Sequence, residues 1–566
     1  MDLLLDLSAA PGRTLRRRAE HALRDAVVSG RLAPGTRLPS TRALAAQLGV
    51  SRGVVVDAYA QLAAEGYLLT RRGGGTTVAN AGATVANGGA DVTDRGADAR
   101  IAGADGRARD AAVADRGADA RIAGADGRAR GADVADRGTE GAVLGSERAG
   151  PAAIRHDLRP ALPALAGFPR REWLASLGRV LRELPDERLG YPDPAGMPEL
   201  RATLAAYLGR VRGVRTTPER MVITGGLRQG LDLLWSSLAS VGVRRVAVER
   251  PGWRGWNQTA AAAGLETVPL AVDRDGAVID ALVDGSDALV DGREALIDGS
   301  DARVDESEAL VDGAGAPVDG DDAPAGEGKA AAAPPVDAVG VTPAHQFPTG
   351  AVLSAARRSA LVAWAQRTGA IVVEDDYDAE FRYDRKPIGS LQGLAPDVVV
   401  YGGTASKTLA PALRIGWLAL PPQLVAPVAA AQRRLGGAPA PLEQLALADL
   451  IARGELDRHL RRQRRAYRRQ RDALLAHLAR ELPEVRVEGA AAGLHAVLRL
   501  PDGSDEAATI AAARARGVAL DGLGDGAPAL VVGYANLPAA AVPAAVAALA
   551  AAVREAAPEA ALRGGR

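Results

Sequence analysis

The stretch that decides the fold is VVVYGGTASKTLAPALRIGWLAL, residues 398–420. Its apolar run, Val398–Tyr401, predicts a buried strand, and the small residues that follow predict a turn. Lys407 comes directly after that turn, so its amine is expected at the mouth of a strand. Open α/β sheets bind their ligands at this place. We therefore expect a large α/β domain with a ligand site at Lys407.

Lysine is scarce in this chain, which narrows any lysine chemistry to few candidates. Of 69 basic residues only Lys329, Lys386 and Lys407 are lysine. A codon bias toward arginine accounts for the scarcity. Lys329 falls in an acidic stretch and Lys386 in a polar segment, both poor places for a reactive amine. For Lys407 the alternative is an ordinary exposed lysine.

A dense group of acids forms the second part of the expected site. In AIVVEDDYDAEFRY, residues 370–383, Ile371–Val373 predict a buried strand, and Glu374, Asp375, Asp376, Tyr377 and Asp378 follow at its end. Four carboxylates so close would repel one another unless a cation is near. A protonated pyridine nitrogen is a suitable cation, because a neighbouring carboxylate raises its pKa. A solvated acidic loop and a divalent-metal site are the alternatives.

An anion site and an aromatic face complete the pattern. MVITGGLRQGLDLLW, residues 221–235, predicts a strand, a turn at Gly226 and a helix whose free N–H groups can bind an anion. Ser406 and Arg414 flank the lysine and could complete a phosphate cradle. Trp253 in VERPGWRGWNQ could stack on a ring, or it could be a core residue. A lysine amine, an acid, a phosphate site and an aromatic face are what pyridoxal phosphate requires of a protein.

The first 80 residues carry a different pattern. Residues 14–29 have the apolar spacing of a helix. Ser40 is a predicted N-cap for a helix over 41–48, and Ser51 is a predicted N-cap for a second helix over 52–64. Residues 67–70 and 76–79 predict two short strands around Arg71–Gly75. These elements describe a winged helix-turn-helix, whose second helix enters the major groove of DNA. Eleven arginines stand against six acids in this segment, including Arg37, Arg42, Arg52, Arg71 and Arg72 at the expected DNA-facing turns; a solvated basic surface is the alternative.

Length and composition set the domain organisation. With 566 residues, zero net charge and no cysteine, the chain is too long for one core and cannot use disulfides or thiolate ligands. Residues 1–80 are expected to form the DNA-binding domain, 81–150 a disordered repetitive linker, and 151–566 one large domain with a low-complexity insertion at about 280–335. A signal peptide and a membrane span are not expected, so the cytoplasm is the expected location.

The N-terminal motif resembles a known family of regulators. PGTRLPSTRALAAQLGVSRGVVVDAYAQLAAEGYL, residues 34–68, is similar to the winged helix of the GntR family over its whole length. The resemblance implies that Arg42, Ser51 and Arg52 contact operator DNA and that Gly74, in the wing, approaches the minor groove.

The rest of the chain resembles the MocR subgroup of that family, in which a fold-type I aminotransferase-like domain follows the winged helix. The matching motifs include YPDPAGMPELRATLAAYLGRVRGV, VTPAHQFPTGAVLS, VVEDDYDAEFRY and YGGTASKTLAPALRIGW. The resemblance implies a pyridoxal 5'-phosphate cofactor, a homodimer and the following roles. Lys407 forms the Schiff base, Asp375 pairs with the pyridine nitrogen, Tyr377 meets the 3′ oxygen, Trp253 stacks, and Gly226, Ser406 and Arg414 serve the phosphate.

Two departures from working aminotransferases bear on function. Phe347 stands where those enzymes carry an asparagine, and Val531 stands where they carry the arginine that binds the substrate carboxylate. We therefore expect a cofactor-responsive transcription regulator whose effector is pyridoxal phosphate itself, with no catalytic or metal-binding residues. A regulator with fixed cofactor that senses an amine, and an active aminotransferase with a fused DNA-binding domain, are the alternatives.

Overall fold

A computed structural model of the 566-residue chain describes residues 14–29, 31–71, 75–79, 153–280, 335–383, 388–489, 491–524 and 526–556, with the single positions 5, 7 and 282. The expected linker at 81–150, nearly all of the insertion at 280–335, and Lys329, Lys386, Arg72 and Gly74 lie outside these residues. The winged helix and the large domain fall in one compact unit.

The N-terminal part is the expected winged helix. Its elements are α1 (Leu15–Val28), α2 (Thr41–Leu48), α3 (Arg52–Ala64) and the antiparallel pair β1 (Leu68–Arg71) and β2 (Gly75–Val78). Ser40 caps α2, because its side chain accepts from the backbone N–H of Ala43 at 3.2 Å. Ser51 is the N-cap residue of α3 but makes no side-chain cap bond, unlike the prediction. A small core that includes Leu23, Leu44 and Leu62 holds the helices together.

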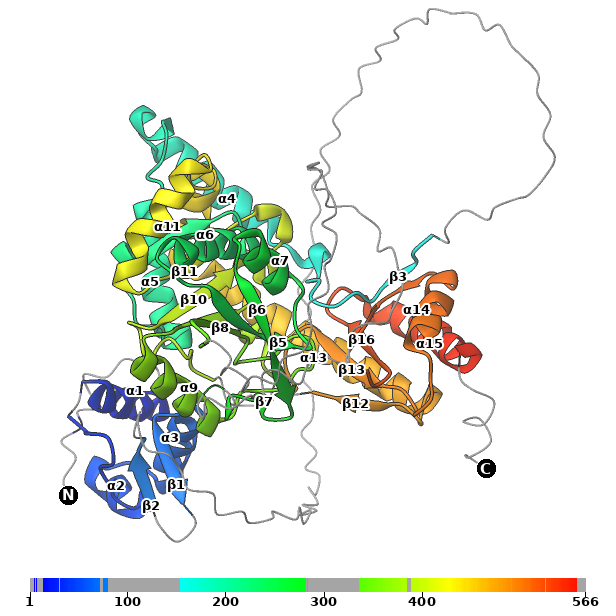
Figure 1. The fold of residues 1–566 in the computed structure, drawn as a ribbon, viewed down its shortest axis with the longest axis horizontal. Helices are drawn as coiled ribbons and strands as arrows, with labels where there is room; N and C mark the ends of the chain where they lie inside the picture. The colour runs from blue at the N-terminus through cyan, green and yellow to red at the C-terminus, as the bar shows by residue number, and fades with distance from the viewer. Residues whose placement is uncertain are drawn as a thin grey trace, which may run out of the picture. The chain divides into compact units, whose positions relative to one another are not determined.

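The large domain is built on an eight-stranded sheet in the order β4-β11-β10-β9-β8-β5-β6-β7 (Figure 1). Neighbours from β10 to β6 run parallel, whereas β11 is antiparallel to both β10 and β4. The strands are β4 (Met221–Thr224), β5 (Arg245–Arg250), β6 (Glu266–Asp273), β7 (Gly276–Ala277), β8 (Ala338–Val341), β9 (Ile371–Asp376), β10 (Val399–Thr404) and β11 (Gly416–Ala419).

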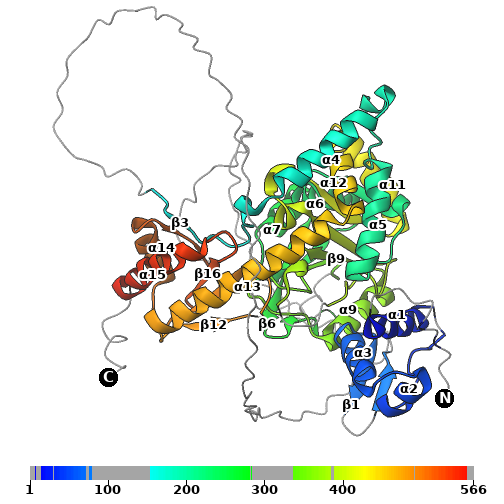
Figure 2. The same cartoon turned by 180° about the vertical axis from the view of Figure 1, so that it is seen from behind.

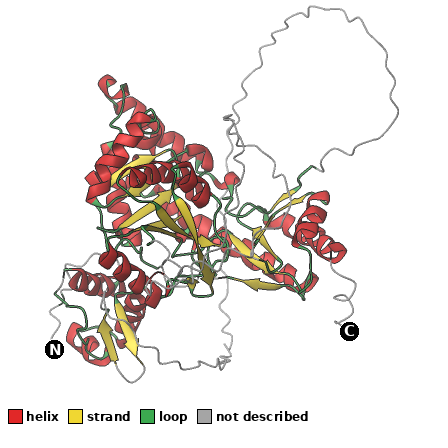
Figure 3. Cartoon of the chain, in the orientation of Figure 1, coloured by secondary structure: helices red, strands yellow, loops and turns green. Residues whose placement is uncertain are grey.

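Helices cover this sheet, as the red and yellow elements of Figure 3 show. They are α4 (Arg170–Glu183), α5 (Pro198–Arg212), α6 (Leu227–Ser240), α7 (Gly255–Ala262), α9 (Ala355–Thr368), α11 (Pro422–Arg434) and α12 (Pro441–Ala452). Apolar side chains of the strands, such as Val222, Val373 and Val400, are fully buried. A parallel sheet covered on its faces is the arrangement expected of an α/β domain.

A second, smaller sheet follows the long helix α13 (Glu455–Glu481), which Figure 2 shows as one continuous element. Its antiparallel order is β12-β13-β16-β15, and a separate parallel pair joins β14 to β3. The elements are β3 (His156–Asp157), β12 (Arg486–Glu488), β13 (His495–Arg499), α14 (Glu506–Ala515), β14 (Val518–Ala519), β15 (Asp521–Gly522), β16 (Ala529–Gly533) and α15 (Val542–Ala556).

One helix among the described residues is apolar and long enough to span a membrane, at Ala539–Ala556. Its residues Val546, Leu549 and Val553 are buried in the largest hydrophobic core. The packing of α15 against α13 and α14 accounts for this apolar surface.

Two local predictions were wrong in the same way. Gly402–Thr404, expected as a turn, continue β10, because β9 and β11 pair with them on both sides. Glu374–Asp376, expected beyond the end of a strand, belong to β9 and are buried. In both places the pairing of neighbouring strands overrides the local sequence preference.

Candidate functional site

The parallel strands deliver the expected ligand-binding residues to one edge of the large sheet. Lys407 lies in the short helix α10 (Ala405–Thr408) directly after β10, Asp375 lies near the end of β9, and Trp253 follows β5. The carboxyl ends of parallel strands meet at one edge, where α/β sheets bind ligands. The sequence prediction that these residues share a site agrees with this topology.

Lys407 and Asp375 influence each other electrostatically. Burial lowers the pKa of the Lys407 amine, while the charges of Asp375 and Asp378 oppose that shift. Burial, together with the charges of Asp376 and Asp378, holds the pKa of Asp375 well above its usual range, and the lysine charge works against the shift. The Oδ1 atom of Asp375 is buried and has no hydrogen-bond partner in the described part of the chain. A cationic N–H group beside it would satisfy that oxygen.

The other acids of the EDDYD segment have partners of their own, which the sequence did not reveal. Glu374 accepts from the backbone N–H groups of Leu391 and Gln392, each at 2.8 Å. Asp376 accepts from Arg212 Nε at 2.6 Å and from the Tyr401 hydroxyl at 2.8 Å. The segment is therefore a buried strand end and not a solvated acidic loop, and one oxygen each of Asp375, Asp376 and Asp378 has no hydrogen-bond partner among the described residues.

Two of the residues expected to hold a phosphate lie beside each other at the start of α6. Gly226 has φ +107° and precedes the helix, and a Cβ added there would come within 3.6 Å of the Arg414 guanidinium. Arg414 itself has a left-handed backbone, with φ 48°. A cavity of about 500 Å³ borders both elements and is lined by Gly225, Gln229, Ala412, Leu413, Arg414, Gly437, Ala438, Pro439, Ala440 and Glu443. Free N–H groups at a helix N-terminus and a guanidinium suit a phosphate.

Ser406 and Trp253 are also placed near this strand edge. The Ser406 hydroxyl lies 3.0 Å from the Thr404 hydroxyl, and its N–H donates to the same oxygen at 3.1 Å. Trp253 is half-buried, and a Cβ at Gly255 would come within 2.3 Å of its ring, so only glycine leaves room for the indole. Trp253, Ser406 and Lys407 all follow strands of the large sheet.

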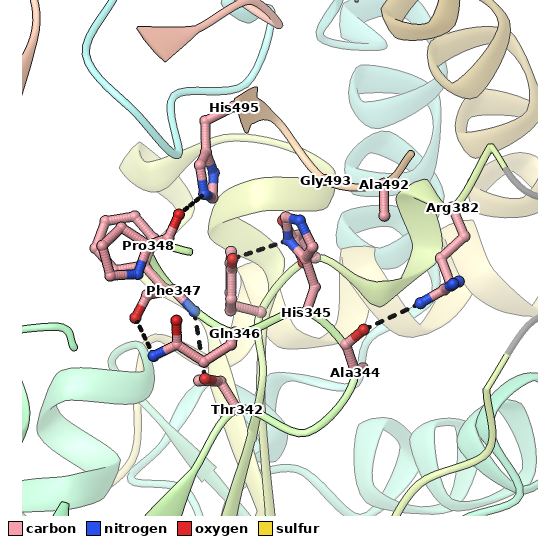
Figure 4. Close-up of polar contacts among 12 residues, drawn as sticks. Thr342, Ala344, His345, Gln346, Phe347, Pro348, Arg382, Ala492, Gly493 and His495 are labelled. Carbon is pink, nitrogen blue, oxygen red and sulfur yellow. Dashed lines mark hydrogen bonds and ion pairs between the residues drawn. The ribbon is translucent and has the colours of Figure 1, made fainter. Parts of the chain in front are cut away.

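Two histidines that sequence reasoning missed lie beside this group. His345 Nδ1 is 3.1 Å from the Tyr377 hydroxyl and 3.0 Å from Asp378 Oδ2. His495, from the small sheet, lies with its Nε2 3.0 Å from the carbonyl oxygen of Pro348 (Figure 4). The two rings are 5.2 Å apart. The sequence carries no signal for this contact, because His345 and His495 are 150 residues apart in the chain.

Glu249, at the end of β5, is held by the loop that carries Phe347. It accepts from the Thr342 N–H at 3.1 Å, from the Thr342 hydroxyl, and from Gln346 Nε2 at 3.3 Å. Burial raises the pKa of Glu249 to about 7, and burial also raises the pKa of Glu374 to about 7.

These two raised pKa values predict that the folded protein loses stability as the pH rises. Folded Glu249 and Glu374 bind protons up to about pH 7, whereas unfolded glutamates release them near 4.5. Folding therefore takes up protons between these values, and the free energy of unfolding falls by up to about 1.4 kcal/mol per pH unit for each proton. Thermal unfolding of cofactor-free protein at pH 5, 6, 7 and 8 should show a falling Tm.

Glu249→Gln should reduce that pH slope, because the amide cannot titrate. Glu484→Gln, at an exposed position, is the matched control and should leave the slope unchanged. An equal slope in wild type and Glu249→Gln would contradict the assignment to Glu249.

The expected DNA-contacting residues lie on the winged helix as predicted, except for one that cannot be placed. Arg42 near the start of α2 and Ser51 and Arg52 at the start of α3 are all exposed. Arg52 Nε donates to the Thr41 hydroxyl at 3.4 Å. Gly74 lies outside the described residues.

The winged helix contacts the large domain through the turn after α3. The Ser359 hydroxyl of α9 donates to the Gly66 carbonyl at 3.4 Å, and Leu394 packs against the winged-helix core. Leu394 follows the loop that Glu374 holds from β9. Strand β9 thus carries Asp375 and also Glu374, which holds the loop that leads to Leu394.

Comparison with known proteins agrees with this geometry. Residues 15–78 match the bacterial regulatory proteins of the gntR family, and residues 169–305 and 322–549 match the aminotransferase class I and II family. The chain belongs to the aminotransferase class I and II family over most of its length, and a GntR winged helix precedes that domain. The same combination of domains is expected from the resemblance to the MocR subgroup.

Named relatives are similar to this chain over most of its length. The chain is 29% identical to the pyridoxine biosynthesis transcriptional regulator PdxR of Corynebacterium glutamicum, over 87% of this chain and 84% of that protein. It is also 29% identical to the probable rhizopine catabolism regulator MocR of Rhizobium meliloti, over 89% and 85%.

Solved aminotransferases share the fold of the large domain. The α-aminoadipate aminotransferase LysN of Thermus thermophilus is 25% identical with a TM-score of 0.57, covering 70% of this chain and 92% of that one. The kynurenine aminotransferase of Pyrococcus horikoshii is 24% identical with a TM-score of 0.59, covering 71% and 92%.

Proposed function

We propose that this protein is a transcription regulator that binds pyridoxal 5'-phosphate at Lys407 and changes its affinity for operator DNA in response. The observation that carries the proposal is a buried lysine, Lys407, under the electrostatic influence of Asp375, a buried carboxylate whose Oδ1 has no partner in the described residues. The same chain also bears a GntR winged helix. The name of the PdxR relative, a regulator of pyridoxine biosynthesis, supports this effector.

The residues present fit this cofactor. Asp375 Oδ1 would accept from the pyridine nitrogen, the Tyr377 hydroxyl would meet the 3′ oxygen, and Trp253 would cover the ring. Gly226, Ser406 and Arg414 would hold the phosphate. When bound, pyridoxal phosphate supplies an aldehyde that condenses with an unprotonated amine. Burial lowers the pKa of Lys407 and so raises the share of its amine that is unprotonated at neutral pH.

The departures at Phe347 and Val531 favour a regulator over an aminotransferase. Val531 is 1% exposed and packs with Val497, Leu523 and Ala529, so an apolar cluster occupies the place where the expected arginine would bind a carboxylate. Without that bidentate ion pair an amino acid loses a strong contact. We infer that efficient transamination is absent.

For the DNA partner, we infer that Arg42, Ser51 and Arg52 contact the operator and that Gly74 lies at the minor groove. The contact of Gly66 and Leu394 with the large domain supports a mechanical link between the two sites. A ligand shifts such a system only if it binds two arrangements with different affinity.

We further propose that the protein acts as a homodimer in the cytoplasm. Leu174, Leu181, Leu189 and Tyr191 are 69%, 53%, 59% and 105% exposed, an apolar surface around α4 that a second copy would cover. Transcription regulators named among the relatives support the location.

The direct test measures operator binding with and without the cofactor. DNA selected from a random library by the wild-type protein is titrated in a fluorescence anisotropy assay, with pyridoxal phosphate or with pyridoxal, which lacks the phosphate. We expect pyridoxal phosphate to change the apparent Kd by about 5- to 150-fold, the usual range of allosteric coupling, and pyridoxal to do so much less.

Three other outcomes would each point elsewhere. An unchanged Kd with bound cofactor would make pyridoxal phosphate a fixed group, with another molecule as the effector. Rapid conversion of amino acids to keto acids would support the alternative function, an active aminotransferase with a fused DNA-binding domain. Absence of cofactor binding would overturn the proposal.

A further inference from the structure

One ring nitrogen of His345 lies between the Tyr377 hydroxyl and a carboxylate. His345 Nδ1 is 3.1 Å from the Tyr377 hydroxyl oxygen and 3.0 Å from Asp378 Oδ2. All three residues are buried, at 2%, 7% and 1% exposure for His345, Tyr377 and Asp378. A ring nitrogen carries either a proton or a lone pair. It therefore either donates toward these oxygens or accepts the proton of the hydroxyl, and it cannot do both.

The carboxylate decides between these two states. Ionised Asp378 only accepts hydrogen bonds, so a lone pair on His345 Nδ1 would face the lone pairs of Oδ2 across 3.0 Å. A proton on Nδ1 removes this repulsion and gives the carboxylate a donor, and a partner of this kind commonly fixes the tautomer of a histidine. With Nδ1 protonated, His345 cannot accept the hydroxyl proton of Tyr377. That proton is then left for another acceptor.

The segment that leads into β13 holds the imidazole and the carboxylate in place. Gly493 has φ +75°, and a Cβ added there would come within 2.1 Å of His345 Cε1 and 2.7 Å of Asp378 Oδ2 (Figure 4). The hydroxyls of Tyr383 and Tyr534 donate to the Gly493 carbonyl oxygen at 2.5 and 2.8 Å. Glycine is required at this position, because any side chain would displace the histidine or the carboxylate.

We propose that His345 and Asp378 are positioning residues: Asp378 keeps the proton on His345 Nδ1, so that the Tyr377 hydroxyl donates its own proton to the 3′ oxygen of pyridoxal phosphate. The inference rests on the proposed cofactor site and adds the two residues that set the donor at one of its atoms. A donor at that oxygen favours the ring form with more negative charge there. It therefore lowers the pH at which the visible absorption band of the bound cofactor titrates.

The charge of Asp378 by itself predicts the opposite effect. The titratable groups around the hydroxyl are His345, Asp375, Asp378 and Glu249, with His495 beyond His345. Burial, followed by the charges of Asp378 and Asp375, holds the pKa of Tyr377 well above its usual range, so the hydroxyl keeps its proton and can donate. The charge of Asp378 also raises the pKa of Lys407. Loss of this charge alone would lower the titration midpoint, whereas loss of the Tyr377 donor would raise it.

Asp378→Asn separates the two effects, because its amide is of the same size and can donate to Nδ1. The full-length protein is loaded with pyridoxal phosphate, and its visible absorbance is titrated across about pH 5–9. We expect the midpoint to rise by about one pH unit in Asp378→Asn and in Tyr377→Phe, since a hydrogen bond to a charged group changes an equilibrium about tenfold. Once Tyr377→Phe has removed the hydroxyl, adding Asp378→Asn should lower the midpoint.

Two variants of His345 test its N–H group. His345→Asn can place an N–H near the position of Nδ1 and should keep the midpoint within about 0.3 pH unit, a factor of two. His345→Phe keeps a ring without nitrogen, so the hydroxyl turns to Asp378 and the midpoint should rise by about one unit. His477→Phe is the matched control and should change nothing, because His477 Nδ1 contacts the Ala473 carbonyl oxygen of its own helix. Tm and bound cofactor per chain show that each variant is folded and loaded.

Two results of the titrations would overturn the inference. The first is a midpoint that falls or stays unchanged in Asp378→Asn, because the charge alone would then account for the effect of this residue. The second is an equal rise in His345→Asn and His345→Phe, because a role in packing alone would then account for the effect of the histidine.

The tautomer of His345 can also be measured without the cofactor, which separates this inference from the proposed function. In protein labelled with nitrogen-15 at its six histidines, NMR reports which ring nitrogen carries a proton, and the signals lost in His345→Asn identify the residue. We expect a proton on Nδ1 in the cofactor-free wild type. A proton on Nε2 alone would overturn the inference even if pyridoxal phosphate binds. A wild type that binds no cofactor would overturn the proposed function, while a proton on Nδ1 in that protein would still support the positioning pair.

Discussion

Replacing Lys407 by alanine should abolish covalent capture of pyridoxal phosphate. Reduction of the loaded wild-type protein with borohydride should fix the cofactor on one peptide, and the variant should lose at least about 99% of that label. The reason is that condensation with the aldehyde requires an unprotonated amine. Among the described residues Lys407 is the only lysine, and burial lowers the pKa of its amine. Mass spectrometry of the reduced, digested protein measures the label.

The chain offers a complete set of controls for this experiment. Lys329→Ala and Lys386→Ala test the two remaining lysines and should keep the wild-type label. Lys407→Arg retains a positive charge near Asp375 but has no primary amine, so it should lose the label while preserving the fold. A label that survives in Lys407→Ala and disappears in Lys386→Ala would place the attachment in a part of the chain the structure does not describe.

Local sequence patterns were sufficient for the elements whose ends are set by neighbouring residues. The helices over 41–48 and 52–64 are found with the predicted bounds, because Ser40 and Gly49 enclose the first and the valine- and alanine-rich run of the second contains no proline. The wing strands were predicted within one residue. Lys407 was expected just after a strand and follows β10, since a short apolar run followed by small and polar residues indicates where a buried strand ends.

Features that depend on distant pairing were not predictable in this way. The strand status of Gly402–Thr404 depends on β9 and β11. The partner of Asp376 is Arg212, which lies 164 residues earlier in the chain. His495 meets Pro348 across 147 residues, and nothing near either position marks that contact. Periodicity describes one element at a time, whereas these contacts arise from the order of strands in the sheets.

Replacing Arg52 by alanine should weaken operator binding by about 5- to 150-fold, the loss of about 1–3 kcal/mol that a base-reading arginine contributes. Arg52 is the first residue of α3, where the N-terminal residues of a recognition helix lie nearest the bases, and its side chain is exposed. Arg274→Ala, at a position that is 95% exposed outside the winged helix, removes the same charge and should leave binding unchanged.

Salt dependence then separates base reading from phosphate contact at the winged helix. If Arg42 contacts a phosphate, Arg42→Ala should lower the slope of log K against log salt by about one and weaken all sequences equally. If Arg52 reads a base, its variant should keep the slope and relax the sequence preference at one position of the selected DNA. Wild-type affinity and wild-type sequence preference in Arg52→Ala, measured by anisotropy with a folded, cofactor-loaded protein, would overturn the base-reading role of Arg52, because the variant has lost every donor of that side chain.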